Sequence, residues 1–179
     1  MASDDGETIF FKTLSFSHEF TDKGYEEESQ DREEAQAISL KIGVAVAMAD
    51  GSLDDVEGEV LKSWIIKEVS AFSDAKQKKL KKMFNEALKE GFQLASDGNL
   101  SLSELVERLS EIGEKKTKYD AVELCLDVMA ADGVADAEEM NVIRNVAKAL
   151  DLDMDEIEKM RQNVTLNLSV ELTSEEGLE

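Results

Sequence analysis

A short acidic turn occurs twice in this chain, in the segments ADGSLDDVE (49–57) and ADGVADAEE (131–139). In both, an Asp-Gly pair is followed three residues later by a second aspartate and, after three more, by a glutamate. The copies lie 82 residues apart, and flanking apolar residues keep that separation. These flanking pairs are Ile42 with Leu124, Val46 with Val128, Val60 with Val142, and Leu61 with Ile143. We interpret the pattern as an internal duplication, which predicts two helix-turn-helix units related by a pseudo-twofold axis.

The first turn partly matches the calcium-binding loop of an EF-hand. Gly51 would be the turn glycine and Glu57 the closing bidentate carboxylate. Two earlier positions that should carry carboxylates are instead Val46 and Met48, within the apolar run IGVAVAMA. The chain entering the turn is therefore predicted to be a buried helix, and the EF-hand interpretation is rejected.

A third segment, ASDGNLSLSE, has the same order of residue types, with Asp97, Gly98, Ser101 and Glu104. It begins at residue 95, so it breaks the period of the duplicated pair. Glycine commonly ends a helix, and serine or aspartate commonly caps the next one. This segment therefore indicates that such a turn can simply join two helices.

The composition favours helices. The 179 residues include no proline and few aromatic residues, while Ala, Leu, Glu and Lys are frequent. We therefore expect an all-α fold of about seven helices in a single domain. The expected ranges are 31–49, 54–72, 74–95, 101–113, 117–131, 136–150 and 153–163. One face of the first helix is expected to be buried, through Ala35, Ile38, Ile42, Ala45, Val46 and Ala49.

The chain is expected to have three parts. Residues 1–30 form an acidic arm, which is either mobile or docked on the body through its rings. These rings belong to Phe10, Phe11, Phe16 and Phe20. Residues 31–163 form the helical domain. Residues 164–179 form an acidic tail, whose alternating segment TLNLSVEL is expected to dock in an extended conformation because a lone strand has no partner.

Charge and cysteine content limit the partners and the compartment. A formal charge of −21 repels phosphate backbones and anionic membranes, so we expect no nucleic acid as a partner. The longest apolar run, 42–49, is too short to cross a bilayer, and no secretion signal is seen. Cys125 lies in the apolar segment AVELCLDVM, where a small buried hydrophobe is expected rather than a nucleophile. These features predict a soluble protein of the reducing cytoplasm.

The acidic chain has one basic stretch, AKQKKLKKMF, which contains five lysines: Lys76, Lys78, Lys79, Lys81 and Lys82. Its alternation with Leu80 and Met83 indicates an amphipathic helix with a solvated lysine face. Alternatively, this face pairs with an acidic face of the same molecule or of a second copy.

The duplicated turns have two interpretations. In the first, Asp54 and Asp136 cap the following helices, the glutamates complete capping boxes, and nothing else is required. In the second, the two turns meet and supply hard oxygen ligands to calcium, magnesium or manganese. These ligands would be Asp50, Asp132, Glu57 and Glu139, with Glu123 and Asp127 adding carboxylates from the preceding helix. On spacing alone, capping is the simpler interpretation.

The segments VAVAMADGSLDDVEGEVLKSWI and CLDVMAADGVADAEEMNVIRNVAKALDLD resemble the TerB tellurite-resistance family. The domain of that family also forms the N-terminal part of some membrane-anchored DnaJ-like co-chaperones. The resemblance covers about residues 35–155. It implies an all-helical pseudo-symmetric fold, an acidic surface with a metal-binding site, and a link to tellurite or general stress resistance. The ligands it implies are Asp50, Glu57, Asp132 and Glu139, together with Asp127.

A catalytic constellation is not expected. The only histidine, His18, lies in the arm, and no phosphate-binding glycine loop or nucleophile elbow is present. We therefore expect a non-enzymatic cation-binding domain of a stress-response complex, which reaches a membrane only through another protein. The alternative is a protein-interaction module whose acidic turn residues only cap helices. A metal-dependent hydrolase is a third hypothesis.

Overall fold

A computed structural model of the chain describes residues 30–131, 133 and 137–162, without the side chains of Asp50, Glu138 and Glu139. These residues form seven α-helices and no strand, which confirms the predicted all-α class. The helices are 30–47, α2 (Asp55–Val69), α3 (Asp74–Ser96), α4 (Leu102–Ile112), α5 (Lys115–Met129), α6 (Ala137–Ala149) and 154–162. A short 3₁₀ helix, η1 (Met48–Asp50), follows the first. No predicted helix end is wrong by more than three residues.

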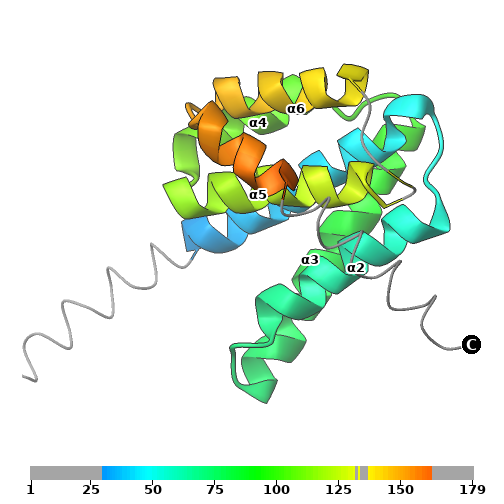
Figure 1. Cartoon of the computed structure of the whole chain (residues 1–179). Coiled ribbons are helices and arrows are strands. Elements are labelled where there is room, and N and C mark those ends of the chain that lie inside the picture. Colours follow the sequence, from blue (N-terminus) through cyan, green and yellow to red (C-terminus); the bar gives the residue numbers. More distant parts are fainter. Residues whose placement is uncertain (1–29, 132, 134–136, 163–179) are drawn as a thin grey trace, which may run out of the picture.

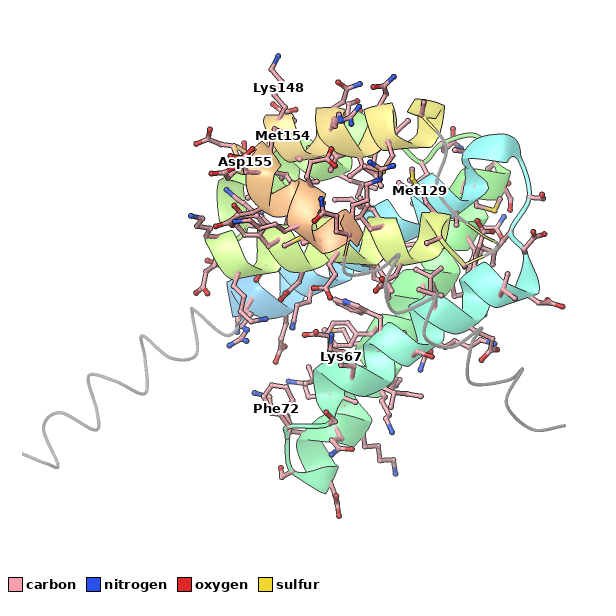
Figure 2. The ribbon with its side chains drawn as sticks, in the orientation of Figure 1. Lys67, Phe72, Met129, Lys148, Met154 and Asp155 are labelled. Carbon is pink, nitrogen blue, oxygen red and sulfur yellow. The ribbon has the colours of Figure 1, made fainter. Side chains whose placement is uncertain are left out.

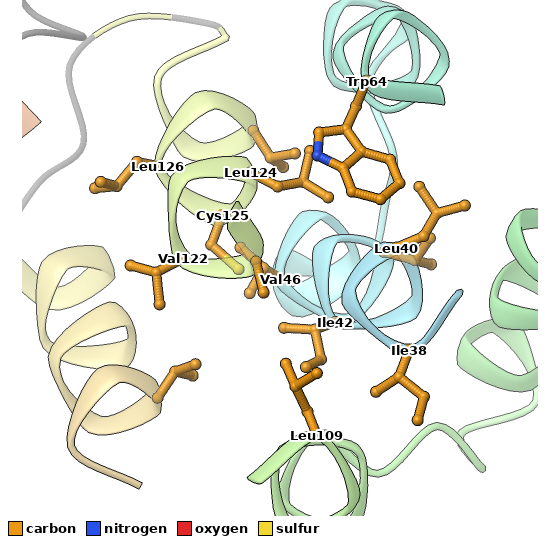
Figure 3. Packing of buried hydrophobic residues seen from close by; sticks show 14 of the residues in the cluster. Ile38, Leu40, Ile42, Val46, Trp64, Leu109, Val122, Leu124, Cys125 and Leu126 are labelled. Atoms are coloured by element: carbon orange, nitrogen blue, oxygen red, sulfur yellow. The ribbon is translucent and has the colours of Figure 1, made fainter. Parts of the chain in front are cut away.

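The helix at 30–47, called the central helix below, lies among α2, α4 and α5 (Figure 3). Leu40, Ile42 and Val44 are all fully buried, although successive side chains point in different directions around the helix axis. A helix that is apolar on all sides is one that the rest of the domain covers. The expectation of one buried face was therefore too narrow, and Ala49, assigned to that face, is exposed.

Gly43 allows the central helix to approach two neighbours closely. A Cβ atom at this position would lie 2.9 Å from Leu61 Cδ2 of α2 and 3.1 Å from Leu124 Cδ2 of α5. Both leucines belong to the buried core, so neither has open space to move into. The glycine therefore sets how tightly the three helices pack.

Helices α2 and α3 form a hairpin that extends beyond the other helices (Figure 1). Trp64 of α2 meets Phe84 of α3 edge-on, with 6.0 Å between the ring centroids. At the turn, Lys76 Nζ lies 4.4 Å from the centroid of the Phe72 ring, which is labelled at the end of the hairpin in Figure 2. The lysines that follow on α3 are exposed, as predicted for the solvated face: Lys78, Lys79, Lys81 and Lys82.

The backbone repeats at the predicted separation. The central helix ends at residue 47 and α5 at Met129, and α2 begins at Asp55 and α6 at Ala137. Each pair of ends is 82 residues apart, like the two turns. The pairs of apolar residues that flank the turns also match in burial, since both members are buried or both are partly buried. The local structure is thus repeated, while the pseudo-twofold relation between the two units stays a prediction.

Several expectations fall on parts of the chain that are not described. The arm and the extended tail lie within 1–29 and 163–179, outside the described residues, and the domain boundaries stay predictions. Among the helices that are described, none has the length and apolar character needed to cross a membrane.

Candidate functional site

The first acidic turn has the predicted backbone and cap. Gly51 adopts a left-handed conformation, with φ 94° and ψ 0°, and its N–H donates to the Met48 carbonyl at 3.0 Å. Glycine takes this conformation without a steric penalty, so it ends the central helix and η1. Asp54 and Glu57 then form a capping box at the start of α2, in which the Asp54 N–H donates to Glu57 Oε2 at 2.9 Å. The predicted capping box is therefore present at this turn.

The second turn shares the same glycine hydrogen bond. The Gly133 N–H donates to the Ala130 carbonyl at 3.1 Å, and Gly133 also has a positive φ, 156°. Helix α6 begins at Ala137, directly after the predicted cap Asp136, which lies outside the described residues. Asp132 is outside them too, as are the side chains of Asp50 and Glu139. Of the five ligands that the family resemblance implies, the structure places the side chains of Glu57 and Asp127, and the ligand set stays a prediction.

The third turn, between α3 and α4, also combines a left-handed glycine with a helix cap. Gly98 follows α3 with φ 71°, and the Glu104 N–H donates to Ser101 Oγ at 3.3 Å at the start of α4. Asp97 accepts from Gln93 Nε2 at 3.0 Å. This turn therefore joins two helices through glycine and a serine cap, as its position outside the repeat predicted.

Acidic side chains gather between α2 and α5 around a small cavity. Its volume is about 20 Å³, close to the minimum that holds one water molecule. The residues that line it are Trp64, Lys67 and Glu68 of α2, and Asp120, Glu123, Leu124 and Asp127 of α5. The site is thus a polar pocket with four carboxylates and one lysine, set against the edge of the apolar core.

Asp127 has the most altered acidity in this pocket. Burial raises the pKa of its carboxyl to about 6, and the neighbouring charge of Glu123 acts in the same direction, whereas Lys67 opposes them. The negative charge of Asp127 is therefore poorly compensated near neutral pH. A bound cation would stabilise the charged form and bring this pKa down.

Two carboxylates that line the pocket have partners outside it, one through a hydrogen bond and one through an ion pair. Gln36 Nε2 of the central helix donates to Glu68 Oε2 at 2.7 Å. Lys116 Nζ lies 2.6 Å from Asp120 Oδ2, and this hydrogen bond raises the pKa of the lysine. Within the described parts of the chain, no group of three or more His, Cys, Asp or Glu residues is arranged to hold a metal ion.

The sequence identified only part of this pocket. The spacing of Glu123 and Asp127 on one helix placed them together. Lys67 and Glu68 were missed because spacing within one helix does not show which residues a second helix brings across. Asp120 was overlooked, although it lies three residues before Glu123 on the same helix. The internal repeat did not indicate the pocket either, because the residues equivalent to Glu123 and Asp127 in the first copy are Lys41 and Ala45.

Cys125 is buried in the core, as predicted. It has no exposed surface, and burial raises the pKa of its thiol to about 12, helped by the negative charge of Asp127. It is therefore a core residue and not a reactive nucleophile.

A second concave feature is an apolar groove of about 590 Å³ between α4 and α6. Leu102 and Val106 of α4 line one side, and Val142, Val146 and Ala149 of α6 line the other. Polar residues complete the lining: Ser103, Glu107 and Ser110 on α4, and Asn145 on α6. Its volume is within the range of small-molecule and peptide-binding sites. The sequence identified Val142 only as the partner of Val60 in the repeat, and the groove itself was not predicted.

Comparison with known proteins agrees with this architecture. The family model described as Tellurite resistance protein TerB matches residues 35–162, which is more than half of the chain. Searches of curated proteins and of solved structures found no match. The match includes both acidic turns, the α2–α5 pocket and the α4–α6 groove. The chain therefore belongs to the TerB family.

Proposed function

We propose that this TerB-family domain is a non-enzymatic component of a tellurite- or stress-resistance system, and that it binds a divalent cation. Its two acidic turns carry the proposal. In each, an aspartate, Asp50 or Asp132, directly precedes a glycine whose N–H closes the same backbone hydrogen bond. A capping box needs no aspartate at that position. The third turn also has an aspartate before its glycine, and the Gly98 N–H donates to the Ala95 carbonyl at 3.0 Å. What distinguishes the two acidic turns is that they repeat in one register and that alanine precedes each aspartate, and this repetition supports a second role.

The chemistry of the ligands defines the kind of cation. Carboxylate oxygens are hard ligands, which suit calcium, magnesium or manganese better than zinc. Glu57, Glu139 and Asp127 are the remaining ligands that we propose. Asp127 supports the choice because its partly buried carboxyl has a raised pKa and lies five residues before Asp132 in the chain.

The cation would act in recognition and not in turnover. We propose a cytoplasmic domain that contacts protein partners of a stress-response complex, at a membrane only through another protein. The turns join the central helix to α2 and α5 to α6. Cation binding there would hold these four helix ends in place and so stabilise the surface that a partner contacts. The family name describes a resistance phenotype, which a binding domain of this kind can support.

Thermal melts of the metal-stripped chain test the cation proposal. Calcium, magnesium and manganese are added separately at moderate salt, so that diffuse screening of the −21 charge is the same in every sample. We expect one ion to raise Tm selectively and saturably. The double variant Asp50→Asn with Asp132→Asn should lose that rise.

Asp97→Asn is the matched control for this experiment, because it removes the aspartate before the glycine of the third turn. This variant should keep the full response. Equal small rises for all three ions, unchanged in the double variant, would contradict cation binding and leave the turns as helix caps.

A second candidate function is a protein-interaction module in which the acidic turn residues only cap helices. The apolar α4–α6 groove favours it, because an exposed concave apolar surface is typical of binding sites. Under this hypothesis, the Asp50→Asn and Asp132→Asn changes leave both cation response and partner binding unaltered.

A further inference from the structure

The α4–α6 groove exposes apolar side chains that nothing in the described part of the chain covers. Two walls face each other, with Val106 on α4 and Val146 on α6 as their deepest residues, both largely buried. Ser103 and Ala149, at the exposed edge, are small and leave the groove wide. A volume of about 590 Å³ is enough for several large side chains.

We propose that the N-terminal arm of the same chain docks in this groove through the segment IFFKTLSFSHEF (9–20). Four of the seven phenylalanines of the protein lie in this segment. Each aromatic ring that is buried removes a large apolar area from water. The segment contains one lysine and one glutamate, so it is close to neutral within an acidic arm. It therefore combines bulky rings for the apolar walls with too little negative charge to be strongly repelled by Glu107, the acidic residue of the groove lining.

The arm starts close enough to reach the groove. The described chain begins at residue 30, and Glu34, about one helical turn later, pairs with Arg108 of α4 at 2.9 Å. Helical spacing places Arg108 on the side of α4 opposite to Val106 and the groove. The arm must therefore cross one helix, about 10–12 Å wide with its side chains. The nine residues from 21 to 29 span up to about 30 Å when extended, which is more than sufficient.

The C-terminal tail is less suited to the same place. Glu158 of helix 154–162 pairs with Arg144, which helical spacing places on the side of α6 facing away from the groove. The apolar residues of the tail begin at Val164, two residues after this helix. No polar linker comparable to 21–29 separates them from the body, so only the later tail residues could cross α6. The tail also has no aromatic residue.

Hydrogen exchange of the full-length protein, read by mass spectrometry, tests the docking. We expect the amides of 9–20 to exchange at least about tenfold more slowly than an unstructured chain does, at any protein concentration. Filling the groove with Ser103→Trp and Ala149→Trp should remove this protection. Both positions are exposed, so the new rings need not displace core atoms.

The matched control makes the same two substitutions elsewhere, as Ser63→Trp on α2 and Ala75→Trp on α3. These positions are also exposed, and this variant should keep the protection of 9–20. Circular dichroism and Tm verify that both double variants are folded. Exchange of 9–20 at the unstructured rate in the unaltered protein, or protection that survives in the filled groove, would overturn the proposal.

Photo-crosslinking gives a readout that leaves the groove intact. A benzophenone amino acid replaces Phe16, and the crosslinks are mapped after mixing isotope-labelled and unlabelled protein. We expect intramolecular crosslinks to α4 and α6. Crosslinks between labelled and unlabelled chains would mean that a second copy is the occupant. Protection of 163–172, and not of 9–20, that is lost on filling the groove would assign the groove to the tail.

Discussion

The backbone N–H of Asp54 donates to Glu57 Oε2 at 2.9 Å, so a residue proposed as a metal ligand also completes a helix cap. The two roles need different properties of the side chain. A cap needs only an oxygen acceptor, which glutamine also provides, whereas a hard cation prefers the charge of a carboxylate. A substitution that keeps the acceptor and removes the charge therefore separates the roles.

Glu57→Gln should keep the stability of the cation-free protein close to that of the unaltered chain. Glu57→Ala should lower the free energy of unfolding by about 0.5–1 kcal/mol, because the cap bond is lost. If the turns bind a cation, both variants should lose the cation-dependent rise in stability. Urea unfolding with and without the selective ion measures both effects.

Glu104→Gln, at the equivalent cap position of α4, is the control for these variants and should leave the cation response intact. A Glu57→Gln protein with an undiminished response would limit Glu57 to capping.

Asp127 should make stability depend on pH between about 4 and 6. Its folded pKa is raised from the usual 3.8 to about 6, so in this window the folded state binds more protons than the unfolded state. The free energy of unfolding of chelator-treated protein should therefore fall as pH rises through the window. Asp127→Asn should be more stable than the unaltered chain at pH 7, by about 1 kcal/mol after allowance for partial exposure.

The two proteins should become nearly equal in stability near pH 3.5, where Asp127 is protonated in the folded state and about two-thirds protonated in the unfolded state. Urea unfolding at the two pH values makes the comparison. Glu123→Gln should lower the pKa of Asp127 by removing a like charge, without abolishing the effect of burial. Equal stability of the unaltered and Asp127→Asn proteins at pH 7 would show that burial of this carboxyl carries no penalty.

Gly43→Ala should destabilise the fold by about 1–3 kcal/mol, because its Cβ would press on Leu61 Cδ2 from 2.9 Å. Gly58→Ala in α2 is the matched control. Its Cβ would meet Leu53 at 3.5 Å, an ordinary contact, and alanine is the better helix former. Gly58→Ala should therefore be neutral or stabilising by up to about 1 kcal/mol. Denaturant midpoints of the two variants provide the test, and equal effects would contradict the packing argument.

The thiol of Cys125 should not react with a disulfide reagent in the native protein. It is fully buried and its pKa is raised to about 12, so the reactive thiolate is scarce and inaccessible. The rate of thiol labelling should rise together with unfolding along a urea titration. Ser63→Cys places a second thiol on the exposed face of α2, and this thiol should react in the native state. Fast labelling of Cys125 without urea would reveal local opening of α5.

Helix number and position could be predicted from the sequence because glycines and caps mark the ends of the helices. The Asp54–Glu57 and Ser101–Glu104 pairs, for example, begin α2 and α4 where expected. Such signals are local, since each is complete within one turn of the chain. The burial of the central helix was underestimated because it is not set by local signals. Which of its sides are covered depends on helices far along the chain.

The candidate sites were harder to predict from the sequence than the helices were. Glu123 and Asp127 could be grouped because both are on α5, but Lys67 and Glu68 reach the same pocket from α2. The α4–α6 groove likewise depends on how two distant helices pack. Such neighbours follow from tertiary packing, which a hydrophobic pattern alone does not specify.

The position of the central helix in the chain has a consequence for biosynthesis. This helix is the first described element to leave the ribosome, yet Gly43 packs against Leu124, which is made about eighty residues later. The side of this helix that faces α5 therefore has no native cover until most of the domain has been translated. During that interval the nascent chain exposes a segment of the kind that chaperones shield from aggregation. The core around the oldest helix therefore cannot be complete before α5 has been made.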